Sequence, residues 1–240
     1  MIEKYLNNRL ITLYILPLII GSLTVFSFQP FNYTFINFII LPILFYLIVF
    51  IKKKSKSTYR IKPFKKNLFI FGTIFGFGFY LSNIHWITNS LTFDENFKFL
   101  IPIGLIFIPL FLSLFCSLTF VILGPFLNFN LSSIFLFSVG LAMSDYLKAK
   151  ILSGFPWNLW IYSFSWATEI IQILNKFGLF ASNLISITLF LLPALFFFKI
   201  SYIQKIFSLF LIFLTGFIFY IYGSHSINQN NENLKSVKEK

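Results

Sequence analysis

Long apolar runs alternate with short polar breaks along the whole of this 240-residue chain. A helix needs about 20 apolar residues (~17 at least) to cross the hydrocarbon core of a bilayer, and each run is of that length. The pattern predicts an all-α fold, a polytopic integral membrane helix bundle with about seven transmembrane helices over residues 1–222, followed by a polar linker or tail over residues 223–240. The predicted spans are residues 10–28, 34–51, 67–91, 99–123, 131–147, 177–198 and 206–222.

The composition excludes a soluble domain. Hydrophobic residues make up 58% of the chain and charged residues 11%, with a mean hydropathy of +0.84, whereas soluble domains carry about 25% charged residues. The net charge of +12 would suit a nucleic-acid partner, but the basic residues gather in the breaks between the runs. Membrane topology explains that distribution, so we expect a membrane-embedded protein with no nucleic-acid partner.

The charges also orient the predicted bundle. Residues 52–66 hold eight basic residues and no acidic one, whereas Asp94 and Glu95 follow the third predicted span. Because cytoplasmic loops are enriched in Lys and Arg, we expect the N-terminus in the cytoplasm and, after seven spans, the C-terminus on the outer side. All four tryptophans then fall near the outer face, as an interfacial aromatic belt would place them. They are Trp86, Trp157, Trp160 and Trp166.

One irregular segment stands between the fifth and sixth spans, where Gly154, Phe155, Pro156 and Trp157 follow one another. Backbone groups that leave a helix find no hydrogen-bond partner in lipid. A Gly and a Pro two residues apart therefore belong at an interface or in a protein-lined cleft, where tryptophan is also common. We predict that residues 154–160 are non-helical and lie at the outer interface beside a cleft.

Two charged residues close to membrane depth, Asp145 and Lys148, are candidates for a function because a buried charge is costly unless it is paired. They are three residues apart and so share one face of a helix. Two interpretations remain open. The residues form a mutually satisfied ion pair, or they line a site for a lipid headgroup or a peptide amine.

His85 stands beside Trp86 near the outer end of the third span. It is either a hydrogen-bonded interfacial residue or a proton carrier. The only other histidine, His225, lies in the polar tail, and the chain has a single cysteine. We therefore expect no metal site and no cofactor.

Small residues inside the spans are expected to serve packing. Cys116 lies in an apolar run, where a thiol stays protonated and is a poor nucleophile. Gly72, Gly76 and Gly78 have the spacing of small residues that let two helices approach closely.

Five stretches in colinear order make the chain resemble the apolipoprotein N-acyltransferase family over essentially its whole length. Within them the chain departs from the family pattern, with Lys148 where the family usually has Arg, Ala149 where Gly is common and Ile161 where Gly precedes the Tyr. A lysine keeps the positive charge of an arginine but cannot bind a headgroup in the bidentate manner of a guanidinium group. The five stretches are residues 26–31 (FSFQPF), 76–86 (GFGFYLSNIHW), 145–148 (DYLK), 153–157 (SGFPW) and 162–163 (YS).

The resemblance implies a role in lipoprotein maturation at the bacterial inner membrane, with the C-terminus in the periplasm. In the family, a Glu–Lys–Cys triad in a periplasmic nitrilase-like domain takes an acyl chain from a phospholipid as a thioester. The triad then transfers the acyl group to the α-amine of a diacylglyceryl lipoprotein. The two transfers together are nucleophilic catalysis in two steps. No such domain follows the seventh predicted span, so we expect this chain alone to be inactive, with a separate nitrilase-like chain as one possible source of the triad.

The resemblance makes this chain the domain that anchors the enzyme and opens a lipid cleft, with no catalytic residue of its own. Two alternatives stay open. One is a non-catalytic membrane scaffold or lipid-binding protein derived from the family, and the other is a small transporter or channel component. The candidate residues for binding substrate or lipid are His85, Trp86, Asp145, Lys148, Gly154, Phe155, Pro156, Trp157 and Tyr162.

Overall fold

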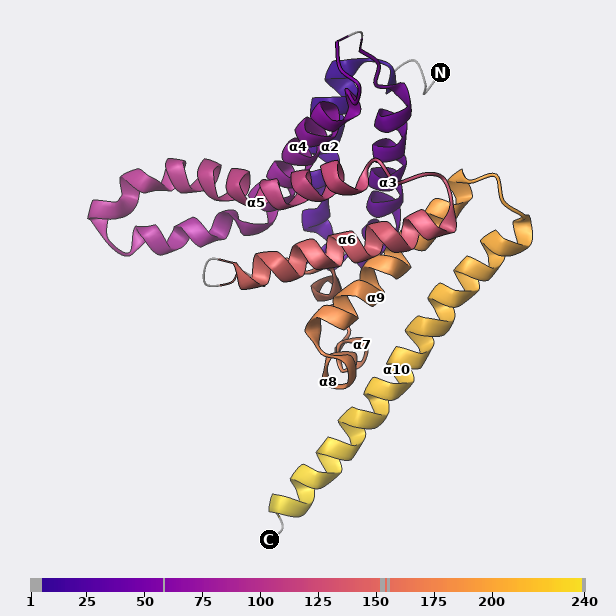
Figure 1. Cartoon of the computed structure of the whole chain (residues 1–240). Coiled ribbons are helices and arrows are strands. Elements are labelled where there is room, and N and C mark those ends of the chain that lie inside the picture. The colour runs from indigo at the N-terminus through magenta and orange to yellow at the C-terminus, as the bar shows by residue number, and fades with distance from the viewer. Residues whose placement is uncertain (1–5, 58, 152–153, 155, 239–240) are drawn as a thin grey trace.

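The computed structural model describes residues 6–57, 59–151, 154 and 156–238, and side chains as far as residue 231. Within these ranges every regular element is a helix, which confirms the predicted all-α class. The longer helices, labelled in Figure 1, are α2 (Leu16–Leu23), α3 (Asn37–Lys54), α4 (Phe64–Ile84), α5 (Ile101–Leu123), α6 (Leu131–Lys150), α9 (Leu179–Leu191) and α10 (Tyr202–Lys238). The short helices are α7 (Thr168–Ile171), α8 (Ile173–Phe177), the π-helical turn Ile11–Ile15 and the 3₁₀ turns Thr24–Ser27, Thr34–Ile36, His85–Thr92, Glu95–Leu100, Trp160–Phe164 and Leu192–Phe197.

Several of these helices can cross a membrane, which confirms a polytopic protein. In the described part of the chain five stretches are long and apolar enough, whereas Ile11–Ser27 is shorter and α6 does not meet the same criterion. The criteria of length and composition therefore identify fewer than the seven predicted spans, and the number seven remains a prediction. The five stretches are Thr34–Lys54, Phe64–Thr92, Glu95–Leu123, Leu179–Phe197 and Tyr202–Asn231.

The C-terminal segment predicted to be a polar linker or tail has helical backbone. Helix α10 continues through it to Lys238. The physical reason is that extending an existing helix adds one hydrogen bond per residue, without the cost of a new nucleus. A polar composition is therefore compatible with helix here because the apolar first part of α10 supplies the nucleus.

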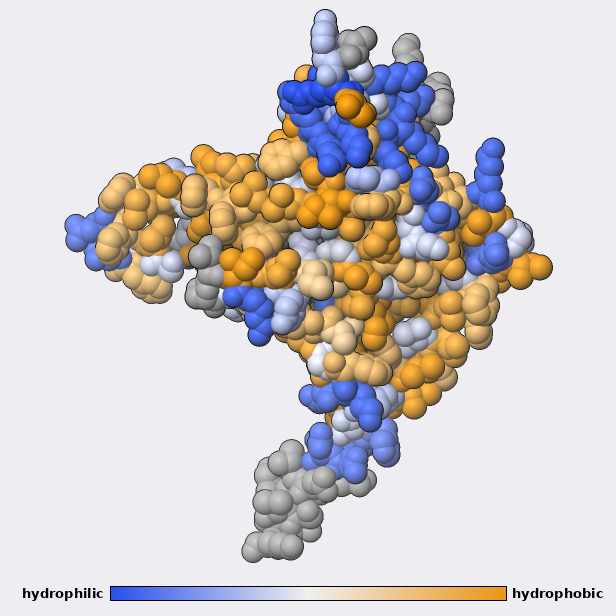
Figure 2. All heavy atoms as spheres, viewed as in Figure 1, coloured by the Kyte–Doolittle hydropathy of each residue, from blue (hydrophilic) through white to orange (hydrophobic). Residues whose placement is uncertain are grey.

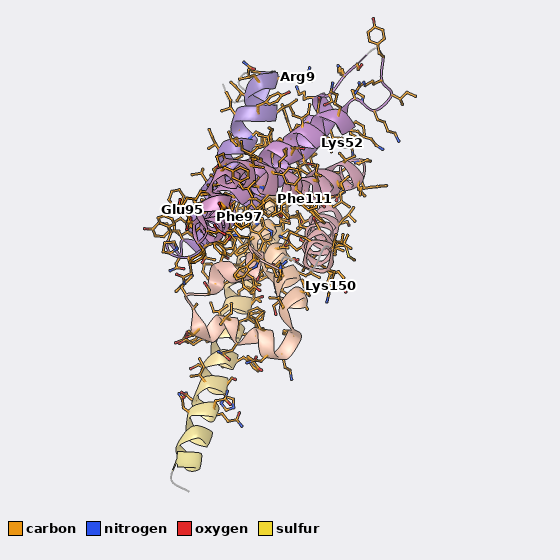
Figure 3. The ribbon with its side chains drawn as sticks, turned by 90° about the vertical axis from the view of Figure 1, so that its left-hand side faces the viewer. Arg9, Lys52, Glu95, Phe97, Phe111 and Lys150 are labelled. Atoms are coloured by element: carbon orange, nitrogen blue, oxygen red, sulfur yellow. The ribbon has the colours of Figure 1, made fainter. Side chains whose placement is uncertain are left out.

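The bundle has two chemically different ends. At one end, which we call the basic end, Lys52 at the end of α3 donates a hydrogen bond to the carbonyl of Leu127 at 2.9 Å. The rings of Phe129 and Phe198 lie 5.8 Å apart at the same end. In Figure 3 Arg9 and Lys52 lie in the upper part of the view, well away from Lys150. Figure 2 shows hydrophilic residues at this end and a broad hydrophobic surface below it.

The tryptophans gather at the opposite end, which we call the tryptophan end. The rings of Trp86 and Trp157 are 5.6 Å apart, and the indole of Trp166 donates to the hydroxyl of Thr34, in the 3₁₀ turn that precedes α3. Trp160 packs against Phe79 of α4, with ring centroids 5.3 Å apart. These contacts bring the segments that carry the four tryptophans together, and their place at the outer face of the membrane remains a prediction.

Helix α4 lies at the centre of the bundle because its glycines let two neighbours approach. A side chain at Gly72 or Gly76 would collide with the backbone of α5, and one at Gly78 would meet the carbonyl of Leu18 in α2. This confirms the close packing predicted from the glycine spacing. Around this contact the core is rich in fully buried aromatic rings, namely Phe45, Phe71, Phe75, Phe120, Phe137 and Phe190.

The close contact between α4 and α5 predicts the effect of a single methyl group. In the variant Gly76→Ala the new Cβ would lie 2.7 Å from the Cα of Ser113, so the helices must move apart. We expect a loss of about 1–3 kcal/mol in the free energy of unfolding. The matched control is Gly216→Ala on α10, where nothing lies within 4 Å of the added atom. Thermal unfolding in detergent micelles measures both, and equal unfolding temperatures would contradict the predicted packing.

Candidate functional site

A cleft of about 690 Å³ opens at the tryptophan end of the bundle. We call it the tryptophan cleft. Three segments that are far apart in the sequence line it, and each contains at least part of one of the stretches that carry the family resemblance. The lining residues are Val25, Phe28, Gln29, Pro30, Phe31, Ser82, Asn83, His85, Trp86, Pro156, Trp157, Asn158, Tyr162 and Ser165.

The first wall is the break that follows α2. Here the 3₁₀ turn ends, Phe28 is extended, and the peptide bond between Gln29 and Pro30 is cis. The side chain of Gln29 reaches across the cleft to donate to the hydroxyl of Ser165 at 3.4 Å. The sequence FSFQPF thus gives a turn whose aromatic and proline side chains face the cleft rather than continuing the helix.

The second wall is the end of α4, where the α-helix gives way to a 3₁₀ turn at His85. The Nδ1 atom of His85 lies 3.1 Å from the carbonyl of Ser82, so Nδ1 carries the hydrogen and Nε2 is left as an acceptor when the ring is neutral. The indole of Trp86 donates to the carbonyl of Asn83 at 3.1 Å. Both side chains are therefore oriented by the last turn of α4, and the ring of Trp86 remains 44% exposed.

The third wall is the segment predicted to be irregular. Gly154 has a φ of +83° and Asn158 a φ of +57°, and neither is part of a helix. A side chain at Gly154 would also collide with the carbonyl of Ala149, so the position requires glycine. The predicted non-helical segment beside a cleft is confirmed for residues 154 and 156–159, and helix resumes at Trp160. Phe155 lies outside the described residues.

A buried polar network lies behind this segment and fixes it in place. The ammonium group of Lys148 donates to Asp145 Oδ1 at 3.1 Å, to the hydroxyl of Tyr80 at 3.3 Å and to the carbonyl of Trp157 at 3.3 Å. These three acceptors match the three N–H donors of an ammonium group. Asn183 donates to the other carboxylate oxygen of Asp145 at 2.9 Å. The network thus joins α4, α6, α9 and the irregular segment.

The geometry bears directly on the two interpretations of the charged pair. Asp145 is 8% and Lys148 2% exposed, and neither lines the tryptophan cleft. Lys148 therefore holds the backbone of Trp157 and has no remaining N–H donor to offer to a headgroup there. A role for the pair in contact with lipid stays a proposal, and the structure places the pair one layer behind the cleft.

Exposed rings form the mouth of the cleft. Trp86 and Trp157 meet edge to face with an interplanar angle of 75°, and Trp157 is 51% exposed. Tyr162 also lines the cleft, and partial burial raises the pKa of its phenol. The phenol is protonated at neutral pH with or without this shift and can donate a hydrogen bond. Rings of this kind suit a boundary where one side is apolar and the other is polar.

A smaller groove of about 270 Å³ runs between α5, α6 and the 3₁₀ turn after α4. Its lining is apolar except for Lys148. The groove is lined by Ile87, Phe107, Ile108, Phe111, Leu112, Phe115, Lys148 and Ile151. Because it presents aliphatic and aromatic side chains, it suits a hydrocarbon chain better than a polar group.

Sequence reasoning missed two residues that organise the site, Tyr80 and Asn183. Tyr80 was noticed only as part of a resemblance, and Asn183 was not singled out at all. A signal for Asn183 was present, since an amide inside an apolar span is costly unless it is paired. Besides binding Asp145, Asn183 accepts a hydrogen bond from the backbone N–H of Ile161 at 3.2 Å, which ties the turn after the irregular segment to α9.

Comparison with known proteins identifies a matching family. The model of the apolipoprotein N-acyltransferase N-terminal domain matches residues 20–189. Proteins named apolipoprotein N-acyltransferase from Rhodopseudomonas palustris and Brucella suis are 27% and 28% identical over 181 and 178 residues, which is 75% and 73% of this chain. The one from Rickettsia bellii is 34% identical over 117 residues, 48% of this chain. The match covers 33%, 33% and 23% of these relatives, so the chain spans about a third of their length at most.

The buried network predicts that its two charges depend on each other. Replacing one partner leaves the other buried and unpaired, so Lys148→Met is expected to cost about 3–5 kcal/mol of unfolding free energy. The double variant Asp145→Leu/Lys148→Met is expected to lose less than the sum of the two single variants.

The chain offers a matched control for this measurement. Lys98 and Glu95 also form an ion pair three residues apart, but both are exposed, so Glu95→Gln is expected to cost about 1 kcal/mol or less. Thermal unfolding in detergent micelles compares the variants. A loss in Lys148→Met no larger than in Glu95→Gln would contradict a structural role for the buried pair.

Proposed function

Because the chain belongs to the apolipoprotein N-acyltransferase family, we propose that it forms the membrane domain that holds lipid for acyl transfer to lipoproteins. In this proposal the tryptophan cleft receives the glycerol region and upper acyl chains of a phospholipid donor or of a diacylglyceryl lipoprotein acceptor. The observation that carries the proposal is the convergence of three distant segments on one largely apolar cleft, one of them the end of the membrane-spanning helix α4.

The chemistry of the cleft supports a lipid as its occupant. Its mouth consists of the exposed rings of Trp86 and Trp157, and its walls carry Phe28, Phe31 and Pro156. Apolar rings provide contact area for hydrocarbon, and the hydroxyl and amide groups that also line the cleft offer hydrogen bonds to ester or phosphate oxygens. A volume of about 690 Å³ holds part of a lipid rather than a whole one, so the remaining chain would follow the apolar surface of the bundle.

The buried network acts in this proposal by positioning the cleft. Lys148 fixes the carbonyl of Trp157, and Gly154 provides the turn that lets the chain reach that point. Lys148 also borders the apolar groove on α5 and α6. In this proposal acyl chains lie on both sides of Lys148 and leave its three hydrogen bonds intact.

The bond-making step is assigned to other residues than those of the cleft. Acyl transfer through a thioester needs an accessible cysteine that can ionise, and the only cysteine here, Cys116, packs against the core within α5. In the proposed reaction a catalytic thiolate attacks the phospholipid ester and releases a lysophospholipid. The α-amine of the lipoprotein then attacks the thioester, loses a proton and frees the thiolate. A nitrilase-like domain would supply this thiolate at the mouth of the cleft.

The distribution of charge supports an orientation in the bacterial inner membrane. The basic end carries the lysine-rich loop between α3 and α4, and the tryptophan end carries Asp94 and Glu95. With the basic end in the cytoplasm, the cleft opens toward the periplasm, where lipoproteins are presented. The N-terminus is then cytoplasmic.

A second candidate function is a lipid-binding scaffold that does not take part in catalysis. The packing of the partly buried Cys116 against the core favours it, because a thiol held there is poorly placed to form a thioester, whereas the tryptophan cleft would serve lipid binding in either case. The two functions share the cleft and differ in whether a lipoprotein is acylated.

Lipid binding in the cleft is tested with phosphatidylethanolamine that carries a photoreactive group on its acyl chain, mixed with the full chain in vesicles. We expect crosslinks to concentrate on peptides that contain residues 25–31, 82–86 and 156–165. Trp157→Ala removes one ring of the mouth and is expected to lower the yield about threefold or more, since a buried aromatic contact is worth ~1 kcal/mol.

The control for this experiment is Phe213→Ala, which removes an aromatic ring that is 75% exposed on the apolar surface of α10. We expect it to leave crosslinking in the cleft unchanged. Uniform labelling along the lipid-facing helices, or equal effects of the two variants, would overturn the proposed lipid site.

A further inference from the structure

A second cavity, of about 480 Å³, lies at the basic end of the bundle. Residues 6–13, the C-terminal end of α3, residues of the loop between α3 and α4, and the start of α4 line it. We call it the basic pocket because five cationic side chains line it. They are Arg9, Lys54, Lys56, Arg60 and Lys66.

Among the described residues, no carboxylate pairs with the charges of the basic pocket. The sequence has no Asp or Glu between residues 4 and 93. In the described part of the chain the ion pairs join Lys98 to Glu95 and Lys148 to Asp145, and neither involves the pocket. Five like charges around one cavity repel each other, and the potential that they create concentrates anions there.

The floor of the pocket has the opposite character. Leu13, Phe50 and Ile51 line it and are only 3%, 8% and 4% exposed. On the turns next to Arg9, the side chains of Leu10 and Tyr14 are 58% and 42% exposed, so an apolar surface continues from the pocket toward the lipid-facing side. A cationic rim above an apolar floor matches a ligand that is anionic at one end and hydrocarbon at the other.

We propose that the basic pocket binds the phosphate group of an anionic glycerophospholipid whose headgroup carries no compensating ammonium group. The guanidinium groups of Arg9 and Arg60 can each bind two phosphate oxygens, and the lysines add point charges around them. The acyl chains of this lipid lie along Leu10 and Tyr14. A general preference for basic residues in cytoplasmic loops explains the number of basic residues in this part of the chain. It does not explain why five basic side chains line one cavity.

The alternatives to this ligand differ in chemistry. A zwitterionic lipid would bring its own ammonium group among the five cations and lose most of the attraction. Inorganic phosphate would use the cationic rim and gain nothing from the apolar floor. An anionic lipid is the ligand that uses both parts of the pocket.

The test uses the full chain in a neutral detergent, with thermal unfolding as the readout of binding. Phosphatidylglycerol is the anionic probe, and phosphatidylethanolamine and inorganic phosphate are the comparisons. We expect phosphatidylglycerol to raise the unfolding temperature in a saturable way, and the other two to have little effect. Equal stabilisation by phosphatidylethanolamine would overturn the proposal, and equal stabilisation by inorganic phosphate would replace the lipid with a free anion.

Two double variants separate the pocket from general electrostatic attraction. Arg60→Gln/Lys66→Gln removes two charges that line the pocket, and Lys62→Gln/Lys65→Gln removes two exposed charges of the same loop region that do not. We expect the first pair to weaken phosphatidylglycerol binding about tenfold or more, and the second by about threefold or less. Equal weakening by both pairs would overturn a built site.

A labelling experiment on the unaltered chain keeps the proposal testable if a variant fails to fold. Phosphatidylglycerol with a photoreactive headgroup is expected to label peptides within residues 6–13 and 54–67. Labelling confined to other peptides would overturn the site. None of these measurements involves acyl transfer, so their failure would leave the proposed function of the tryptophan cleft untouched.

Discussion

A lysine ammonium group inside an apolar helix bundle must find an acceptor for each of its N–H groups, since lipid provides none. Lys148 finds its three acceptors on the side chains of Asp145 and Tyr80 and on the carbonyl of Trp157. These acceptors belong to α6, α4 and the irregular segment, and Asn183 adds α9 through Asp145. The requirement to satisfy one buried charge therefore fixes how four parts of the fold meet at the tryptophan end.

The shape of the tryptophan cleft follows from this constraint. The chain leaves α6, turns at Gly154 with a φ that favours glycine, and is held at Trp157 by the lysine beneath it. The ring of Trp157 is then turned toward Trp86 rather than into the core. The segment that contains Trp157 thus contacts the buried polar network through its backbone carbonyl and also lines the tryptophan cleft.

The sequence alone predicted the features that depend on local composition. The apolar runs indicated the membrane helices, Gly72, Gly76 and Gly78 indicated close helix contacts, and the Gly and Pro near residue 155 indicated an irregular segment. It did not predict that Lys148 would bind Tyr80 and the carbonyl of Trp157, because contacts between distant segments depend on how the helices pack. The continuation of α10 to Lys238 was also missed, since the polarity of the segment hid the effect of the preceding helix.

The measurement that tests this account most directly is mass spectrometry of lipoprotein N-termini from cells that lack their own N-acyltransferase. The cells receive either this chain alone or this chain fused to the part of the Rhodopseudomonas palustris relative that follows its matching region. The account predicts free α-amines with the chain alone, N-acylated lipoproteins with the fusion, and a marked loss of acylation when the fusion carries Trp157→Ala. Acylation by the chain alone, or a fusion whose activity does not depend on Trp157, would contradict it.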